Sequence, residues 1–183
     1  MNIHNTLRDM VRAKEGKNTS PSAGIMDSQS AKTKDVGGSE RGFDGNKKVN
    51  GRKRHILVDT MGLLLVGIVQ AANIADSKVG KILLMAGFVE DFNLKVVWAD
   101  KGYRGKVLRS LAKALEIELK ITDRSKDKSF ELEPRRWVVE RTFAWLGKQR
   151  RLSKDYERLP KVSEIFLYTC MIPLMLNRLT KRA

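Results

Sequence analysis

Three acidic side chains stand in apolar or basic surroundings, and their types and positions point to metal-ion chemistry. Asp27 lies within the strand-forming stretch GIMDSQS, Asp100 ends the apolar run KVVWAD, and Glu140 follows RWVV in a stretch with helical spacing. If these carboxylates converge in the fold, two of them about 4 Å apart repel each other by about 4 kcal/mol at an effective dielectric constant of about 20. A cation must therefore lie among them.

Mg²⁺ is the cation that such ligands favour, with Mn²⁺ as a substitute, because hard divalent ions prefer carboxylate oxygens. A lysine or arginine side chain is the alternative counter-charge. Zn²⁺ is disfavoured, since the two histidines and one cysteine of the chain lack the spacing of zinc ligands. A pair of Mg²⁺ ions would activate a water or a 3′-hydroxyl group and stabilise the departing oxygen of a phosphodiester.

The helical stretch around Glu140 leaves two interpretations open. At 100° per residue, Arg136, Ala144, Gly147 and Arg151 fall within about 40° of Glu140 on the helix surface. Two small residues and two arginines leave room beside the carboxylate for an ion and a phosphate. The alternative is an exposed ion pair between Arg136 and Glu140, which stabilises a helix by only a few tenths of a kcal/mol.

The composition favours a polyanionic partner. Lys and Arg total 36 against 21 Asp and Glu, a formal charge of +15, which suits nucleic acid or an acidic membrane surface. A solvated basic surface without a specific partner is the alternative. The single Cys170 excludes an internal disulfide bond. The N-terminus lacks the apolar region of a signal peptide, and the run IFLYTCMIPLML is too short for a membrane span and is broken by Pro173. We therefore expect a soluble protein without membrane contact.

The elements that must position the carboxylates follow a mixed α/β pattern. Residues 1–23 are polar and indicate a flexible N-terminal tail or linker with at most one short helix, whereas residues 24–183 suit a single domain. Two β-rich runs within residues 55–71 join at DTMG and predict a hairpin. Further strands are expected at 24–30, 95–99 and 117–122, and helices from 76 or 77 onward, at 106–115, 134–151 and 162–179. This order predicts a mixed sheet flanked by helices.

A glycine-rich basic segment, residues 31–54, has too few apolar residues for a core element and predicts a mobile loop. Its cations suit phosphate binding, and a merely solvated loop is the alternative. The cations concerned are Lys47, Lys48, Arg52, Lys53 and Arg54.

Four stretches, GIMDSQSAKT, GRKRHILVDTMGLLL, ADKGYRG and RRWVVERTFAWLGKQRRLSKDYERLP, resemble the catalytic half of bacterial insertion-sequence transposases. The resemblance is to the insertion-sequence-five family within the Asp-Asp-Glu (DDE) group, and it extends from about residue 21 to residue 179. It implies a ribonuclease H-like fold with an extra C-terminal helix. By position it makes Asp27, Asp100 and Glu140 the catalytic ligands of two Mg²⁺ ions. It also implies hydrolysis at the transposon ends, followed by attack of the freed 3′-hydroxyl on target DNA.

The DDE group carries a helix signature of Tyr, Arg, Glu and Lys at set intervals, and this chain follows it only in part. Arg136 fits, four residues before Glu140, whereas Glu133 occupies the Tyr position and Gly147 the Lys position. We expect the phosphate contacts to come instead from nearby cations, namely Arg136, Lys148 and Arg151.

Tyr103 and Arg104 follow Asp100 closely and are candidates for contacts with the DNA backbone. Their alternative role is a hydrogen-bonded turn that closes the strand.

The resemblance also implies partners: transposon ends and target DNA, with a homodimer or a mixed oligomer with a longer transposase product. Family members carry an N-terminal helical region that recognises the ends, and the roughly 20 residues before PSAG are too few to form one, so we expect this region to come from another reading frame. A bacterial, nucleoid-associated cytoplasmic location follows. The alternatives are an inactive fragment that binds DNA nonspecifically and a basic RNA-binding protein, which leaves the three carboxylates unexplained.

Overall fold

The computed structural model describes residues 2–33, 40–122 and 136–180. Within these ranges the strands are β1 (Ala23–Lys32), β2 (Gly42–Asp44), β3 (Val49–Asp59), β4 (Leu64–Ala71), β5 (Val96–Asp100) and β6 (Glu118–Thr122). The helices are α1 (Asn2–Lys14), α2 (Asp76–Val89), α3 (Lys106–Ala114), α4 (Arg136–Gly147) and α5 (Pro160–Thr180), with short 3₁₀ turns η1 (Lys101–Tyr103) and η2 (Arg150–Leu152).

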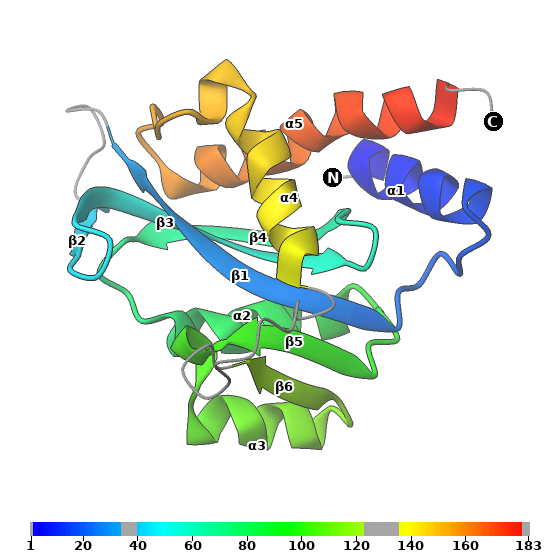
Figure 1. Ribbon diagram of the computed structural model, residues 1–183, viewed down its shortest axis with the longest axis horizontal. Helices are drawn as coiled ribbons and strands as arrows, with labels where there is room; N and C mark the ends of the chain where they lie inside the picture. Colours follow the sequence, from blue (N-terminus) through cyan, green and yellow to red (C-terminus); the bar gives the residue numbers. More distant parts are fainter. Residues whose placement is uncertain (1, 34–39, 123–135, 181–183) are drawn as a thin grey trace, which may run out of the picture.

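One mixed sheet forms the centre of the molecule, with the strand order β2-β3-β1-β5-β6 and with β4 paired to β3 (Figure 1). Strand β1 is antiparallel to β3 and parallel to β5, and β5 is parallel to β6. The strands and helices expected from the sequence are present, including the hairpin of β3 and β4. The predicted mixed sheet flanked by helices is therefore confirmed.

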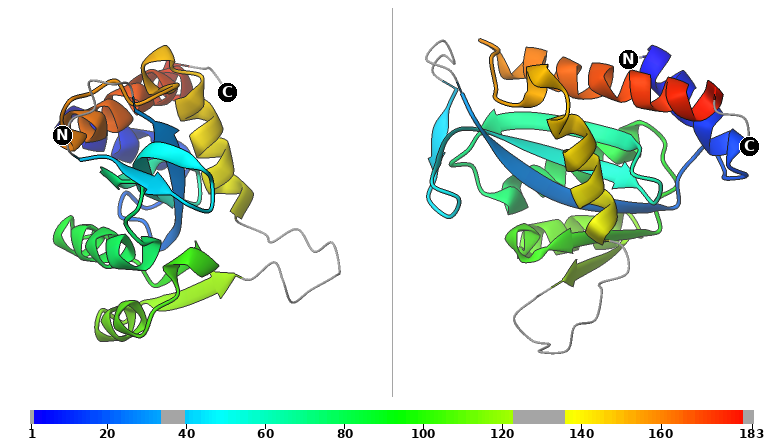
Figure 2. Two further views of the ribbon diagram at one scale, coloured as in Figure 1. Left: turned by 90° about the vertical axis from the view of Figure 1, so that its left-hand side faces the viewer. Right: turned by 45° about the horizontal axis from the view of Figure 1, so that its top comes forward.

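Two apolar cores lie on opposite faces of the sheet because side chains alternate along each strand. Ile25 belongs to the core that packs under α1, α4 and α5, whereas its neighbour Met26 belongs to the core under α2 and α3. Figure 2 shows α2 and α3 on one side of the strands and α4 on the other. Helix α4 crosses the sheet over β1 (Figure 1), so any side chain on the α4 side of β1 lies near this helix.

The turn between β3 and β4 is closed by Asp59. Its Oδ1 accepts the backbone N–H groups of Met61 and Leu63 at 2.9 and 2.8 Å. Gly62 in this turn has φ +79°, and a Cβ there would lie 2.7 Å from Oγ1 of Thr142 on α4. Glycine is therefore required both by the left-handed backbone and by the close approach of the helix.

The N-terminal segment differs from the flexible tail expected for residues 1–23. Helix α1 packs against α5, and Val11 is buried in the core shared with α4 and α5. Arg12 is buried as well and forms an ion pair with Asp59, and its Nε donates to the carbonyl of Asn18 at 2.7 Å. This segment packs on the protein although its sequence is polar, because arginines as well as apolar side chains are buried on its inner face.

The basic segment 31–54 is also not the loop that its composition predicted. Strand β1 continues to Lys32 and β3 begins at Val49, while residues 34–39 lie outside the described ranges. Arg52 is fully buried and donates to the carbonyls of Glu157 and Arg158 at 2.8 and 2.7 Å. These bonds replace water around the guanidinium group, so a cationic stretch can form a central strand.

Helix α5 passes by length and composition as a membrane-spanning helix, with 22% of its most apolar stretch buried. In the fold it packs against β4 and α1, with Leu167, Met171 and Met175 in the core. Pro173 lies inside this helix, within the span 162–179 that the sequence predicted to be helical.

Replacing Arg12 with methionine should lower the free energy of unfolding by about 3–5 kcal/mol, because the buried carboxylate of Asp59 loses its counter-charge. Urea denaturation at neutral pH measures the loss. The double variant Arg12→Met/Asp59→Asn should recover a large part of it, since asparagine removes the charge and keeps Oδ1 for the turn. A double variant as unstable as Arg12→Met alone would contradict this account.

Candidate active site

The structure brings two of the three predicted carboxylates side by side. Met26 on β1 is the partner of Ala99 on β5 in the parallel ladder, and the next residues along the two strands are Asp27 and Asp100. Adjacent strands lie about 4.8 Å apart, so the two carboxylates are close neighbours.

Both carboxylates project from the sheet toward the side of α4. Ile25 and Trp98, two positions before Asp27 and Asp100 on their strands, pack in the core shared with α4. Alternation along the strands therefore gives Asp27 and Asp100 the same face. The sequence sets this arrangement, because each aspartate stands two positions after an apolar residue of that core, and those two residues, Ile25 and Trp98, are partners in the ladder.

The environment of Asp27 opposes its ionisation. The pKa of Asp27 is raised from 3.8 to about 6: burial is the largest cause and the charge of Asp100 adds to it, while the backbone N–H of Ser28 and the cations Arg136 and Lys47 act in the opposite direction. The Ser28 N–H donates to Oδ1 of Asp27 at 2.7 Å. A site in which two carboxylates raise each other's energy binds a divalent cation favourably, since the cation removes their repulsion.

Glu140 lies on α4, the helix that packs against β1, but its carboxylate pairs with Arg136. Oε1 of Glu140 is 3.6 Å from Nε of Arg136, and the Glu140 side chain is 49% exposed. This is the exposed ion pair that the sequence analysis left open. Within the described ranges, no three His, Cys, Asp or Glu side chains stand where they could hold one metal ion. The role of Glu140 as a metal ligand stays a prediction.

Helix α4 itself is fixed to the turn between β3 and β4. Oγ1 of Thr142 donates to the carbonyl of Gly62 at 2.9 Å, and the guanidinium group of Arg141 donates to the carbonyl of Met61 at 3.2 Å. The Arg141 guanidinium also stacks on the rings of Trp137 and Trp145, at 4.3 and 4.7 Å from their centroids. The position of Glu140 along the sheet is therefore set by contacts on either side of it.

The predicted DNA-binding cations separate into buried and exposed groups. Arg52, Lys53 and Arg54 are buried, and their charged groups bind protein carbonyls or carboxylates, so they are not available to phosphates. Lys53 pairs at 2.8 Å with Asp76, the first residue of α2. The exposed group is Lys47, Lys48, Arg104, Lys148 and Arg151.

Two cations of the exposed group, Lys47 and Arg151, have different partners. Nζ of Lys47 donates to the carbonyl of Ser28 at 3.1 Å, next to Asp27. Arg151 pairs with Glu157 at 2.7 Å and lies over the ring of Phe166.

Tyr103 has no exposed surface and cannot contact DNA in this structure. Its hydroxyl group bonds Nδ1 of His55 at 3.1 Å, so the alternative, a hydrogen-bonded turn, describes it. His55 was given no role by the sequence. The signal that could have found it is its place in the apolar run HILVD, where a polar side chain needs a buried partner.

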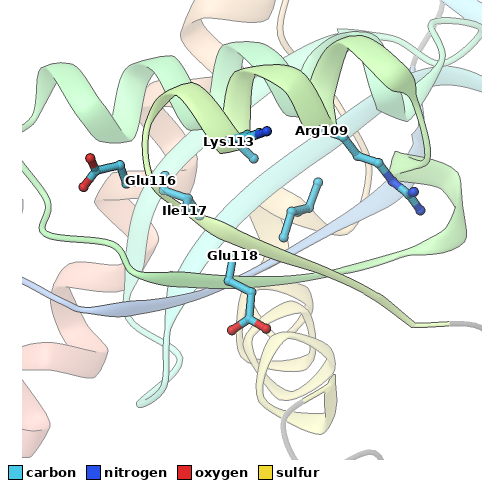
Figure 3. A pocket seen from close by; sticks show the side chains of 7 residues that line it. Arg109, Lys113, Glu116, Ile117 and Glu118 are labelled. Atoms are coloured by element: carbon cyan, nitrogen blue, oxygen red, sulfur yellow. The ribbon is translucent and has the colours of Figure 1, made fainter.

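Two surface cavities lie apart from the carboxylates. One, of about 340 Å³, is lined by Arg109, Lys113, Glu116 and Glu118 among others (Figure 3). Glu118 begins β6, whereas Asp100 pairs with Thr122 at its end. A larger cavity of about 1090 Å³ lies between α2, β4 and α5. Neither is lined by Asp27, Asp100 or Glu140, and their linings lack a carboxylate pair on neighbouring strands.

Comparison with known proteins identifies the family. Residues 18–175 match the family described as the transposase DDE domain. The chain belongs to this family. The chain is similar to the putative transposase for insertion sequence element IS402 of Burkholderia cepacia. The two sequences are 33% identical over 126 residues, which cover 64% of this chain. The match spans 59% of the length of that relative. Membership of the insertion-sequence-five family stays a prediction.

The likeness to one solved structure with a TM-score above 0.5 confirms the predicted ribonuclease H-like fold. The chain resembles the simian T-cell lymphotropic virus intasome in complex with PP2A regulatory subunit B56 gamma, with a TM-score of 0.52, 14% identity, and coverage of 81% of this chain and 48% of that one. It also resembles the catalytic core domain of BIV integrase, with a TM-score of 0.48, 13% identity, and coverage of 88% and 86%.

Replacing Asp27 with asparagine should stabilise the metal-free protein at pH 7. The pKa of Asp27 is raised from 3.8 to about 6 in the folded state, so folding binds a proton between these values and this group's contribution to stability falls as pH rises through them. At pH 7 the ionised carboxylate costs up to about 3 kcal/mol, which Asp27→Asn removes.

Urea denaturation without divalent ions measures this gain, which should shrink as pH falls below 6 and nearly disappear by about pH 3, where Asp27 is mostly protonated in both states. The exposed Asp91 offers a matched control, since Asp91→Asn makes the same exchange outside the site. An equal gain at pH 3 and pH 7 would refute the assigned cause.

Proposed function

We propose that this chain is the catalytic domain of a DNA transposase that hydrolyses phosphodiester bonds at transposon ends and joins the freed 3′-hydroxyl to target DNA. The observation that carries the proposal is the pair Asp27 and Asp100, in register on adjacent parallel strands and facing α4. Membership of the transposase DDE domain family supports it. DNA, as transposon end and as target, is the proposed substrate, and the positive charge of the chain is consistent with it.

The residues present fit a divalent metal ion in their donor chemistry. Asp27 and Asp100 supply hard carboxylate oxygens at adjacent positions, and the pKa of Asp27 is raised by burial and by the neighbouring charge of Asp100, both of which a bound cation would offset. Asp27, Asp100 and Glu140 would hold the metal, with Mg²⁺ as the proposed ion and Mn²⁺ as its substitute. Bound there, the ion supplies Lewis-acid activation of the attacking water or 3′-hydroxyl group.

Arg136 is the counter-charge of the site in the metal-free state. It lowers the pKa of Asp27 and pairs with Glu140, so it interacts with carboxylates on both sides of the proposed site. Its Nε is buried and has no hydrogen-bond partner among the described residues. We infer that Glu140 exchanges Arg136 for the metal, and that the guanidinium group released in this way binds a phosphate of the DNA.

The exposed cations around the site provide phosphate contacts in this proposal. Lys47 lies next to Asp27 through its bond to Ser28, and Arg104 follows Asp100 by four residues. Phosphate contacts of this kind orient the duplex and carry no sequence information. Selection of the transposon ends is thus assigned to other determinants of the transposition complex.

A second function, nonspecific DNA binding without chemistry, is favoured by one observation. The carboxylate of Glu140 pairs with Arg136 and does not join Asp27 and Asp100 in a group of three. An inactive fragment would retain this pairing with metal present, whereas the transposase would exchange it. Cleavage assays distinguish the two.

Purified protein, alone and fused to an end-recognition region, should cut DNA that carries the transposon ends in the presence of Mg²⁺ or Mn²⁺. Asp100→Asn should abolish cutting, because it removes a charged metal ligand, while Asp91→Asn retains it. Gel analysis of end-labelled DNA measures the products. Binding by the fusion without nicking under either metal would favour the inactive fragment.

Loss of a phosphate contact should change the salt dependence of DNA binding. Lys47→Ala and Arg104→Ala should each weaken binding to unrelated duplexes alike and reduce the slope of log K against log salt by about 0.9. Fluorescence anisotropy at several salt concentrations measures the slope. Lys113→Ala, beside the cavity of Figure 3, is the matched control and should leave it unchanged. Equal slopes for all variants would reject these two contacts.

A further inference from the structure

The backbone ladder between β1 and β5 ends before the carboxylates. Its last paired residues are Met26 and Ala99, so Asp27 and Asp100 are the first residues beyond it. Like charges repel at this point, where no ladder hydrogen bonds hold the two strands together. Another contact must therefore fix the distance between Asp27 and Asp100.

Tyr103 is placed to make this contact. It ends the 3₁₀ turn η1 that begins directly after Asp100, and its side chain is completely buried in the core under α2 and α3. The carboxylates lie on the opposite face of the sheet, so Tyr103 does not touch the proposed substrate side.

The hydroxyl group of Tyr103 reaches two strands at once. It bonds Nδ1 of His55 on β3 at 3.1 Å, and the hydroxyl group of Ser28 on β1 lies beside it and acts to lower the pKa of Tyr103, which burial raises. Ser28 and His55 are register partners in the antiparallel ladder of β1 and β3, and Ser28 directly follows Asp27. One hydroxyl group thus joins the turn after Asp100 to the residue after Asp27.

The hydrogen bonds around the Tyr103 hydroxyl group can be ordered with a neutral imidazole, in which the buried Nε2 of His55 has no partner among the described residues. Burial lowers the pKa of His55 to about 4, so the imidazole is neutral and can accept at Nδ1. Ser28 then donates to the Tyr103 oxygen, and Tyr103 donates to His55. This chain of hydrogen bonds is enclosed, since Ser28, His55 and Tyr103 are all buried.

The surrounding atoms leave the Tyr103 ring little freedom. A Cβ at Gly80 on α2 would lie 2.8 Å from Cδ1 of Tyr103, so this helix can approach the ring only with glycine there. At the other end of the turn, the N–H of Gly102 donates to Oδ1 of Asp100 at 3.0 Å. Packing of the ring therefore fixes the turn that orients the Asp100 carboxylate.

We propose that Tyr103 is a positioning residue that holds Asp100 at the distance from Asp27 required to share a divalent cation. This inference rests on the proposed function. The Tyr103 hydroxyl acts through Ser28 and His55, in place of the ladder bonds that β1 and β5 lack beyond Met26 and Ala99.

The test is Mn²⁺ binding to the DNA-free protein, measured by electron paramagnetic resonance of the free ion. Tyr103→Phe removes the hydroxyl group and keeps the ring, and it should raise the dissociation constant of Mn²⁺ about 10-fold, as loss of partners behind metal ligands does. Tyr168→Phe is the matched control, because the Tyr168 hydroxyl accepts the Gly67 N–H at 2.9 Å on α5, away from the carboxylates. It should lower thermal stability and leave Mn²⁺ affinity unchanged.

Each outcome separates this inference from the function on which it rests. A wild-type protein that binds no Mn²⁺ contradicts the proposed metal chemistry and the inference with it. Wild-type binding with equal affinity in Tyr103→Phe overturns the positioning role alone. Ser28→Ala removes one bond of the same chain with a smaller change in volume, and it should weaken Mn²⁺ binding in the same direction; unchanged affinity in this variant would also overturn the proposal.

Discussion

Repulsion between two carboxylates at the ends of adjacent parallel strands is the constraint on which the rest of this structure depends. The register of β1 and β5 brings Asp27 and Asp100 together, and burial raises the pKa of Asp27. The fold answers this on both faces of the sheet. Cations approach from the α4 side, and the hydrogen bonds of Tyr103 hold the backbone on the other side.

Sequence patterns were sufficient for most of the helices and strands and for placing Asp27 and Asp100 on strands. Asp27 and Asp100 each follow a strand-forming run, and the helical spacing around Glu140 placed it on one side of α4. The sequence could not show which charged residues are buried. Arg52 and Arg54 lie in a stretch whose composition is typical of a solvated loop. They can be buried in a strand only because they donate to backbone carbonyls of the segment before α5, about 100 residues later. The predicted contact of Tyr103 with DNA was wrong for the same reason: the sequence does not show that Tyr103 is buried, because its partner His55 is 48 residues away.

The buried arginines also change the meaning of the net charge. The formal value of +15 counts every cation equally. Arg12 is buried against Asp59, and Arg52 and Arg54 are buried against backbone carbonyls. These three arginines therefore stabilise the fold and contribute little to the electrostatic potential at the surface. In the proposed function, the attraction for DNA would come from a smaller set of cations than the composition indicates, and their positions near Asp27 and Asp100 would matter more than their number.

The bonds that tie α4 to the turn of the β3–β4 hairpin limit how Glu140 can move. Thr142 and Arg141 hold the helix to Gly62 and Met61, so the helix cannot slide along the sheet without breaking them. In the proposed exchange, the Glu140 carboxylate would therefore leave Arg136 by rotation about its side-chain torsions, and such rotations take place within nanoseconds at an exposed position. Loading and unloading of such a centre would be invisible in the outline of the molecule, and its rate would be governed by the arrival of ions and not by a slow rearrangement of domains.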